Sequence, residues 1–284
     1  MKLSVVTINY NNYSGLRKTI ESVVNQTNKD FEYIIIDGGS TDGSVDVIKE
    51  YADRIDYWVS EPDRGIYNAM NKGIDVAKGE YCIFMNSGDT FCDFNTVECV
   101  LEHNLNSDII CGNTMMPTRH EPPSVITFNT LFSGAICHQC AFIKTVLMKK
   151  YRYDEKLKIV ADRKFFVQAL ILDNCSYSAI DVDVVNYDIN GFSSKNRFLS
   201  DYEYASVLEE LIPERVRQDY ALQTFGVLHG DTDYEKFFFE VGQRNYRGLI
   251  YTISIAVIRA ISVFKKSASF VRVFPFMLNS KNKL

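Results

Sequence analysis

The sequence predicts an α/β fold built on a mostly parallel central sheet, followed by a helical C-terminal extension. Three observations predict it. Strand and helix patterns alternate three times within the first 90 residues. The strand patterns are short, apolar and β-branched, which is typical of parallel strands buried on both faces. From residue 197 onward the pattern is mainly helical. We therefore expect a first domain at 1–197, with halves at about 1–90 and 91–197, and an extension at 198–284.

In the first half, strands are expected at residues 3–8, 32–37, 55–60 and 81–85. The helices between them have apolar residues at helical spacing. These residues are Leu16, Ile20, Val23 and Val24, then Val45, Ile48 and Tyr51, then Ile66, Met70, Ile74 and Ala77. Ser14 is expected to cap the first helix, and Gly79 is expected to end the third.

In the second half the alternation loosens. We expect a helix at 96–103, a short strand at 108–111 and a strand at 177–185. Residues 114–123 are polar and contain three prolines, which predicts a loop. Helical patterns occupy 138–150 and 156–173, and a loop follows at 190–195.

Composition narrows the class of protein. The 284 residues carry a net charge of −5, which gives no general attraction for nucleic acid. Residues 246–284 are different, with seven Lys and Arg and no Asp or Glu. The seven cysteines are scattered, as in a protein of a reducing compartment. The first residues lack the features of a signal peptide, so we expect a cytoplasmic protein.

Polar residues follow the predicted strands at their carboxyl ends. Asn9, Asp37 and Ser60 with Glu61 follow the first three strands, and Asn86-Ser87-Gly88-Asp89 follows the fourth. Ligands of open parallel sheets bind at this edge. Asp37 is well placed for a ribose hydroxyl or a base edge, and equally well placed to cap the following turn.

Three other binding sites are disfavoured. The first turn, Asn9-Tyr10-Asn11-Asn12, contains no glycine, whereas a dinucleotide-binding fold needs G-x-G-x-x-G there. This also argues against a nicotinamide oxidoreductase. A P-loop pattern is absent. Cys137 and Cys140 form C-x-x-C, but no second pair follows at the spacing of a zinc site.

At this point the sequence resembles the family 2 glycosyltransferases with the GT-A fold. The resemblance covers roughly residues 3–195 and rests on five segments. They are SVVTINYNN, IIIDGGSTDGS, SEPDRGIYNAMNKGIDVAKGEYCIFMNSGD, HQCAF and ADRKFF. The third segment is long and highly specific.

The resemblance implies an inverting transfer of a sugar from a nucleotide diphosphate donor to an acceptor hydroxyl, with Mg²⁺ or Mn²⁺. A UDP-sugar is favoured, and GDP or dTDP are alternatives. Thr7, Asn9 and Tyr10 would line the base pocket, with Tyr10 stacking, although a plain solvated turn is the alternative. The other implied donor-binding residues are Asp37, Gly38, Asp63, Arg64, Asn68, Lys72, Asn86, Ser87, His138 and Gln139. Surface roles remain open for Arg64 and Lys72.

Two carboxylates receive catalytic assignments from the resemblance. Asp89 is the expected metal ligand, with Asn86 as a neutral helper. The family usually has Asp-x-Asp or Asn-x-Asp-Asp at this turn, so the single carboxylate also allows weak metal dependence. Asp162 is the expected base that takes the acceptor proton. A carboxylate that complements the helix dipole is the alternative for Asp162.

The C-terminal part carries further expectations. Lys195 and Arg197 are placed to contact phosphate, or they belong to a plain basic loop. Residues 249–264 are apolar except for Arg259 and are shorter than the roughly 20 residues of a membrane span. Basic flanks favour a helix on an anionic membrane surface, at the inner face of the membrane, and a helix packed on the domain is the alternative. A surface-bound enzyme would suit a lipid-linked or growing saccharide acceptor. Residues 198–245 contain no interpretable motif, and Phe237, Phe238 and Phe239 are expected in a core or interface.

A second function from another class stays open on the sequence alone. A non-catalytic protein that binds nucleotide-sugars, or serves as a scaffold, would keep the same pocket. Its support is the single carboxylate of Asn86-Ser87-Gly88-Asp89.

Overall fold

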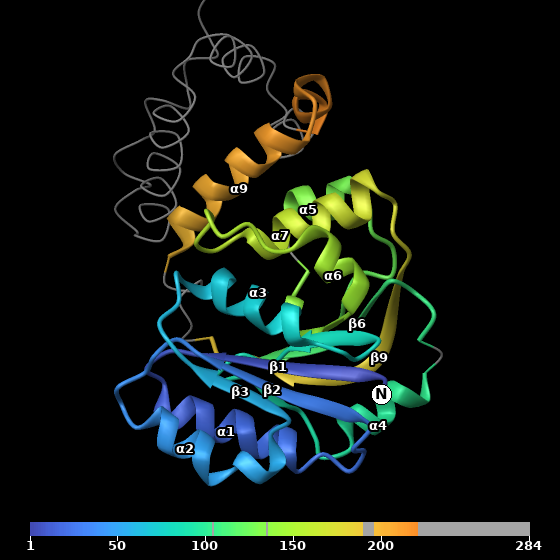
Figure 1. The fold of residues 1–284 in the computed structure, drawn as a ribbon. Coiled ribbons are helices and arrows are strands. Elements are labelled where there is room, and N and C mark those ends of the chain that lie inside the picture. The colour runs from blue at the N-terminus through green and yellow to red at the C-terminus, as the bar shows by residue number, and fades with distance from the viewer. Residues whose placement is uncertain (104, 135, 190–195, 221–284) are drawn as a thin grey trace, which may run out of the picture. The chain divides into compact units, whose positions relative to one another are not determined.

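The computed structural model describes residues 1–103, 105–134, 136–189 and 196–220 (Figure 1). By internal contacts the chain divides into a first unit, Met1–Glu214, and a second unit, Arg215–Leu284. The predicted tail features at 237–239 and 249–264, and Lys195, lie outside the described residues.

One sheet runs through the first unit. Its strands are β1 (Leu3–Asn9), β2 (Phe31–Asp37), β3 (Tyr57–Ser60), β4 (Tyr81–Phe84), β5 (Thr90–Phe91), β6 (Ile109–Met116), β7 (Thr118–His120), β8 (Ala141–Lys144) and β9 (Tyr177–Asn186). Their spatial order is β3-β2-β1-β4-β8-β6-β9-β5, and β7 pairs with β6.

The first four strands are parallel, as the sequence predicts. Their register aligns Asn9 with Asp37, and Asp37 with Ser60. The pairing of β1 with β4 continues beyond β4, because the Ser87 N–H donates to the Ile8 carbonyl. The turn that starts at Asn86 therefore lies beside the end of β1. The predicted polar strand ends are brought together at one edge of the sheet.

The second half departs from the prediction. The segment Ala141–Lys144, expected to be helical, is β8, which pairs antiparallel with both β4 and β6. The predicted loop at 114–123 is also wrong in part. Its first residues extend β6 to Met116, and β7 folds back on β6 as a hairpin. Beyond β8, β6 and β9 are parallel and β5 is antiparallel to β9. The sheet is thus parallel on one side and mixed on the other.

Helices lie on both faces of the sheet, with α1 and α2 on one face and α3, α6 and α7 on the other (Figure 1). The helical elements are α1 (Tyr13–Val24), α2 (Ser44–Glu50), η1 (Ala52–Arg54), α3 (Ile66–Val76), α4 (Thr96–Glu102), α5 (Phe128–Ser133), η2 (His138–Cys140), α6 (Thr145–Tyr151), α7 (Ala161–Phe166), η3 (Val167–Leu172) and α9 (Arg197–Leu211).

The core forms where the sequence places apolar residues on both sides of the parallel strands. All seven residues of β1 are buried. The predicted apolar face of α1 is buried too, including Leu16, Ile20 and Val23. The predicted cap is wrong, because Asn12 caps this helix by accepting the Gly15 N–H, and Ser14 lies inside the helix. Asn12 is the last residue before the helix with a side-chain acceptor in reach of its first turn.

Helix α9 is tied to the segment that leads into α7. The buried carboxylate of Glu203 accepts the N–H groups of Lys158 and Ile159 at 2.8 and 2.9 Å. The Tyr204 hydroxyl donates to the Leu131 carbonyl at 2.6 Å. Contacts of this kind place α9 in the first unit, which runs to Glu214, whereas the sequence analysis put the boundary near residue 197. Within the part of the chain that the structure describes, no helix has the length and apolarity to cross a membrane.

Candidate functional site

Asp37 organises the strand ends at the centre of the edge. Its buried carboxylate accepts hydrogen bonds from Asn9 Nδ2 at 2.7 Å and from the hydroxyls of Ser40 and Ser60, both at 2.6 Å. The Ser40 and Gly39 N–H groups donate to it as well. Burial opposes ionisation, but these donors outweigh it and hold the pKa of Asp37 below its usual value. The carboxylate is therefore ionised and fully engaged by the protein.

Thr7 and Asn9 differ in what they offer to a ligand. Thr7 is fully buried, and its hydroxyl donates to the Met85 carbonyl at 2.8 Å, so it supports β1 and presents no free group. Asn9 is also buried, with its Nδ2 directed to Asp37. Its Oδ1 has no hydrogen-bond partner among the described residues. A buried acceptor of this kind is expected to meet a donor from water or a ligand.

Tyr10, Gly38 and Asp63 come together beside this network. A Cβ at Gly38 would lie 2.4 Å from Asp63 Oδ2 and 3.2 Å from Tyr10 Cδ2. A larger residue at position 38 would therefore displace the side chain of Asp63 or Tyr10. The Tyr10 side chain is 67% exposed, which leaves its ring open for stacking. These three residues thus lie together at the strand ends, where the sequence predicts a nucleotide pocket.

The two cationic side chains that the sequence predicts at the site, Arg64 and Lys72, form ion pairs with carboxylates. Arg64 donates to Glu155 at 2.7 Å, and Lys72 donates to Glu61 at 2.7 Å. Asn68 is buried and donates through Nδ2 to Glu155 at 3.0 Å. Arg64 and Lys72 both form ion pairs with carboxylates in the described structure, which favours the surface roles left open for them.

The turn after β4 contains the predicted metal ligand. Gly88 has φ +112°, and a Cβ there would lie 2.8 Å from Asp188 Oδ2. Asp89 is 4% exposed and accepts the Asp188 N–H at 2.8 Å. Burial raises the pKa of Asp89 to about 6, against the lowering effect of the Asp188 N–H, His138 and Gln139. Ionisation of Asp89 thus costs free energy in the folded protein, and a bound cation would offset that cost.

Asn86 and Ser87 precede it in the same turn. Asn86 Oδ1 is buried and has no hydrogen-bond partner in the described structure. The Ser87 carbonyl accepts Asn12 Nδ2 at 3.0 Å, which fastens the turn to the start of α1. Among described residues, no group of three or more His, Cys, Asp and Glu side chains can hold a metal ion. A cation here would therefore take Asp89 and Asn86 as its protein ligands and complete its shell with water and a ligand's phosphates.

His138, which contacts Asn86 of this turn, forms a close pair with Asp162. His138 Nδ1 lies 3.0 Å from Asp162 Oδ2, and each side chain is 14% exposed. The other carboxylate oxygen, Oδ1, lies 3.3 Å from the Tyr67 hydroxyl. Burial lowers the pKa of His138, but the hydrogen bond and charge of Asp162 outweigh it and raise the pKa above its usual value. Burial also raises the pKa of Tyr67. Asp162 is thus a largely buried carboxylate in contact with two neighbouring side chains.

Gln139 contacts both Cys137 and Asp89. It is buried, and its Oε1 accepts the Cys137 thiol at 3.2 Å. Its side chain also hydrogen-bonds Asp89 and lowers the pKa of that carboxylate. The sequence predicts that Gln139 contacts the donor. In the structure, Gln139 contacts Asp89. All seven cysteines are free thiols, and burial raises the pKa of Cys82 and Cys92.

Two site residues were not predicted from the sequence. Tyr67 lies on α3 and reaches Asp162, and it also donates to the Ile159 carbonyl. No sequence signal distinguishes it from a core tyrosine. Asp188 follows the carboxyl end of β9, and the strand-end rule that found Asp37 applies to it equally.

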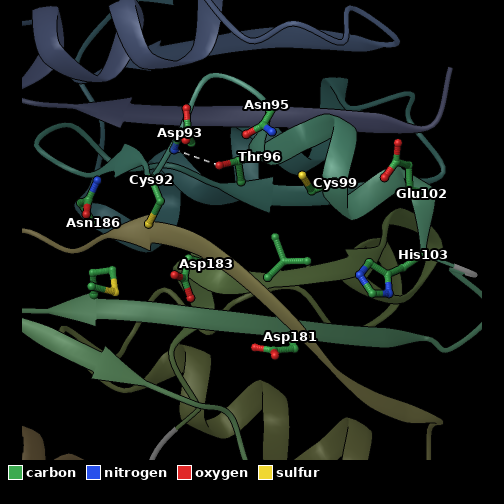
Figure 2. Close-up of a pocket in the computed structure, with 12 residues that line it drawn as sticks. Cys92, Asp93, Asn95, Thr96, Cys99, Glu102, His103, Asp181, Asp183 and Asn186 are labelled. Atoms are coloured by element: carbon green, nitrogen blue, oxygen red, sulfur yellow. Dashed lines mark hydrogen bonds between the residues drawn. The ribbon is translucent and has the colours of Figure 1, made fainter.

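A separate cavity of about 650 Å³ lies away from these residues. Figure 2 shows it between α4, with Thr96 and Cys99, and the strand β9, with Asp181 and Asp183. It contains none of the predicted site residues. Arg119 pairs with both Asp181 and Asp183, which offsets part of the negative charge of the lining.

The chain was compared with known proteins. A protein family described as Glycosyl transferase family 2 matches residues 4–139. An uncharacterized glycosyltransferase of Mycobacterium tuberculosis is 30% identical over 207 residues, which are 68% of this chain and 77% of that protein. A PGL/p-HBAD biosynthesis glycosyltransferase of Mycobacterium bovis is 27% identical over 211 residues, 71% of this chain and 81% of that protein.

Solved structures agree on the fold. S. aureus TarS, residues 1–349 in complex with UDP-GlcNAc, has a TM-score of 0.63 and 19% identity, and the match covers 80% of this chain and 72% of that chain. At this identity the likeness shows the fold alone. The GT-A fold that the sequence resemblance implied is confirmed.

Proposed function

The chain belongs to glycosyl transferase family 2, and from this premise we propose that it is an inverting enzyme that uses a divalent cation. It moves a sugar from a nucleotide diphosphate donor to an acceptor hydroxyl. One observation carries the proposal. Two carboxylates, Asp89 and Asp162, interact with the same His138 from different elements. An inverting transfer needs one carboxylate on the leaving-group side and one on the acceptor side.

Asp162 is the base in this proposal. The acceptor oxygen forms its bond to the anomeric carbon as the bond from that carbon to the diphosphate breaks, and Asp162 takes the hydroxyl proton. The His138 imidazole orients Oδ2, and the Tyr67 hydroxyl lies 3.3 Å from Oδ1. Each oxygen has a second lone pair, so these contacts leave acceptor capacity for the incoming hydroxyl.

Asp89 and Asn86 would hold Mg²⁺ or Mn²⁺. Two features of the turn fit a hard cation, namely the buried carboxylate of Asp89 and the buried, unpartnered Oδ1 of Asn86. When bound, such a cation neutralises the charge that develops on the departing diphosphate. Gln139, which hydrogen-bonds Asp89, keeps that carboxylate oriented.

The nucleotide would bind beside Tyr10, Gly38 and Asp63. The exposed Tyr10 ring supplies a stacking surface, and the unpartnered Asn9 Oδ1 supplies an acceptor for a base N–H. A UDP-sugar is the preferred donor, with GDP- and dTDP-sugars as alternatives. The complex of TarS with UDP-GlcNAc supports this preference by analogy of fold.

The acceptor in this proposal is a lipid-linked or growing saccharide at the inner face of a membrane. Its support is the basic, apolar segment at 249–284 and the name of the Mycobacterium bovis relative, which refers to PGL/p-HBAD biosynthesis. The proposal also places the enzyme in synthesis of a cell-envelope saccharide.

The test is the variant Asp162→Asn. Nucleotide release is measured with a panel of UDP-, GDP- and dTDP-sugars, with water and simple alkyl glycosides as acceptors. Loss of the base should lower turnover by about 10²–10⁴-fold, while UDP binding measured by calorimetry with Mn²⁺ stays unchanged. The exposed Asp53 supplies the control Asp53→Asn. Unchanged turnover in Asp162→Asn would overturn the base assignment, and a non-catalytic binding protein would show UDP binding with no turnover in any variant.

A further inference from the structure

We propose that His138 is a positioning residue for Asp162 and does not contact the donor. This inference rests on the proposed function, because it assumes that Asp162 is the base. The sequence resemblance placed His138 among the donor-binding residues, whereas its contacts in the structure point to a different role. His138 joins the turn after β4 to the helix that carries the base.

The geometry of the imidazole carries the inference. Nδ1 lies 3.0 Å from Asp162 Oδ2, and Nε2 lies 3.4 Å from Asn86 Nδ2. An imidazole has two polar atoms, and both are occupied by protein groups. No ring nitrogen is left to bind a phosphate of the donor.

One tautomer satisfies both contacts. In the neutral state of the ring, the proton on Nδ1 donates to Asp162, and the lone pair of Nε2 accepts from Asn86 Nδ2. This arrangement also explains a second observation. Because the Asn86 amide is turned with Nδ2 toward the ring, its Oδ1 is left as the buried atom without a partner among the described residues. His138 therefore orients the amide oxygen on the cation side and the carboxylate on the acceptor side.

The backbone that carries His138 is fixed on both sides. His138 begins the short helix η2, where the Cys140 thiol donates to the Cys137 carbonyl at 3.2 Å. Gln139, the next residue, is buried and accepts the Cys137 thiol. The hydrogen bonds of Cys137, Gln139 and Cys140 thus stabilise the turn that carries the imidazole and keep the ring beside Asp162.

The consequence for catalysis is orientation of the base. Asp162 is held at Oδ2 by His138, whereas the Tyr67 hydroxyl, 3.3 Å from Oδ1, directs its one proton mainly to the nearer Ile159 carbonyl. The contact with His138 is therefore the stronger of the two that define the plane of the carboxylate. Loss of one contact lets the carboxylate rotate away from the acceptor. A displacement of about 1 Å in a reacting group costs on the order of 10²-fold in rate.

Two isosteric variants separate the contacts of the ring. In His138→Asn the amide nitrogen takes the place of Nδ1 and can still donate to Asp162. In His138→Gln the amide group reaches the place of Nε2 and keeps the contact with Asn86. We expect His138→Gln and His138→Ala to lose about 10²-fold in kcat, and His138→Asn to retain activity within about tenfold. The KM for the donor should stay within about threefold in all three variants.

The readouts distinguish the possible outcomes. A donor contact would instead raise the KM for the donor, and the affinity for UDP with Mn²⁺ would fall in all three variants. Equal kcat in the Asn and Gln variants would also overturn the proposal. Thermal unfolding of each variant identifies a loss of activity that merely follows a loss of fold.

A double variant separates failure of this inference from failure of the proposed function. If His138 acts through Asp162, then Asp162→Asn combined with His138→Gln should be no slower than Asp162→Asn alone. An inactive Asp162→Asn together with a fully active His138→Gln would refute only the role of His138. A fully active Asp162→Asn would refute the base assignment itself.

Discussion

Replacing Asp89 with Asn should stabilise the ligand-free protein at neutral pH while abolishing its use of a cation. Asp89 is buried, and burial raises its pKa to about 6 from an ordinary value of 3.8. The Asp188 N–H, His138 and Gln139 face it and lower the pKa, whereas the charge of the Asp188 carboxylate raises the pKa further. The folded protein therefore holds an ionised carboxylate in a place where the neutral form is preferred.

The magnitude follows from the shift in pKa. A difference of about two units between folded and unfolded states corresponds to about 3 kcal/mol of free energy of unfolding. The sign is destabilising above the folded-state pKa. Between about pH 4 and pH 6 the unfolded chain has lost the proton and the folded chain still binds it, so stability falls as pH rises through this window. The Asn variant carries no charge and avoids this cost.

Urea denaturation in the presence of EDTA measures the effect. At about pH 7.5 the variant should be more stable than the wild-type protein by about 2–3 kcal/mol, and the gap should narrow toward about pH 4. Asn can still accept the Asp188 N–H, so the substitution keeps that contact. The exposed Asp53 again provides the control, because Asp53→Asn should change stability by less than about 0.5 kcal/mol.

Addition of UDP and Mn²⁺ should make the wild-type protein more stable than the Asn variant. The wild-type protein should gain stability from the ligands, and the variant should gain less because it lacks the carboxylate that the cation needs. A variant that is no more stable than wild type at neutral pH, or a gap that does not depend on pH, would refute the reasoning about burial.

Three further predictions follow from the contacts. Gly38→Ala should weaken UDP binding, measured by calorimetry, by about tenfold or more, because its Cβ would lie 2.4 Å from Asp63 Oδ2; unchanged affinity would show that this contact is not part of the nucleotide pocket. Glu203→Ala should cost about 2–3 kcal/mol in urea denaturation, because two N–H groups before α7 lose their buried acceptor; a loss below about 0.5 kcal/mol would contradict it. Arg64→Ala should change stability by less than about 1 kcal/mol, because its ion pair with Glu155 is solvent-exposed; a marked loss of UDP affinity instead would restore the phosphate role for this side chain.

The parallel half of the fold is readable from the sequence because its signals are local. Each strand is a short apolar run, and each ends at a polar residue such as Asn9 or Asp37. The rule that ligands bind at the carboxyl ends of parallel strands then brings these residues to one edge. The register of β1 with β2, which pairs Asn9 with Asp37, agrees with that reasoning.

The mixed half was predicted less well because its pairing is not local. Strand β8 has only four residues and leads directly into α6, so its pattern merges with that of the helix. Its strand conformation is imposed by pairing with β4 and β6, which lie far away in the sequence.

The contacts within the candidate site are also non-local and could not be predicted from the sequence. The residue types of Asp89, His138 and Asp162 were identified, but their mutual contacts could not be, since 24 residues separate His138 from Asp162 and 52 separate it from Asn86. Asp188 was within reach of the strand-end rule and was not singled out. A sequence thus yields candidate chemical groups more readily than the hydrogen bonds that orient them.

Burial and orientation at this site are physically linked. The amide of Asn86, the ring of His138 and the carboxylate of Asp162 form one chain of contacts, and Asp89 interacts with the same ring through its charge. A carboxylate whose ionised form is destabilised by burial gains most from a cation. Under the proposed function, His138 therefore links the carboxylate on the cation side to the carboxylate on the base side, because it interacts with both.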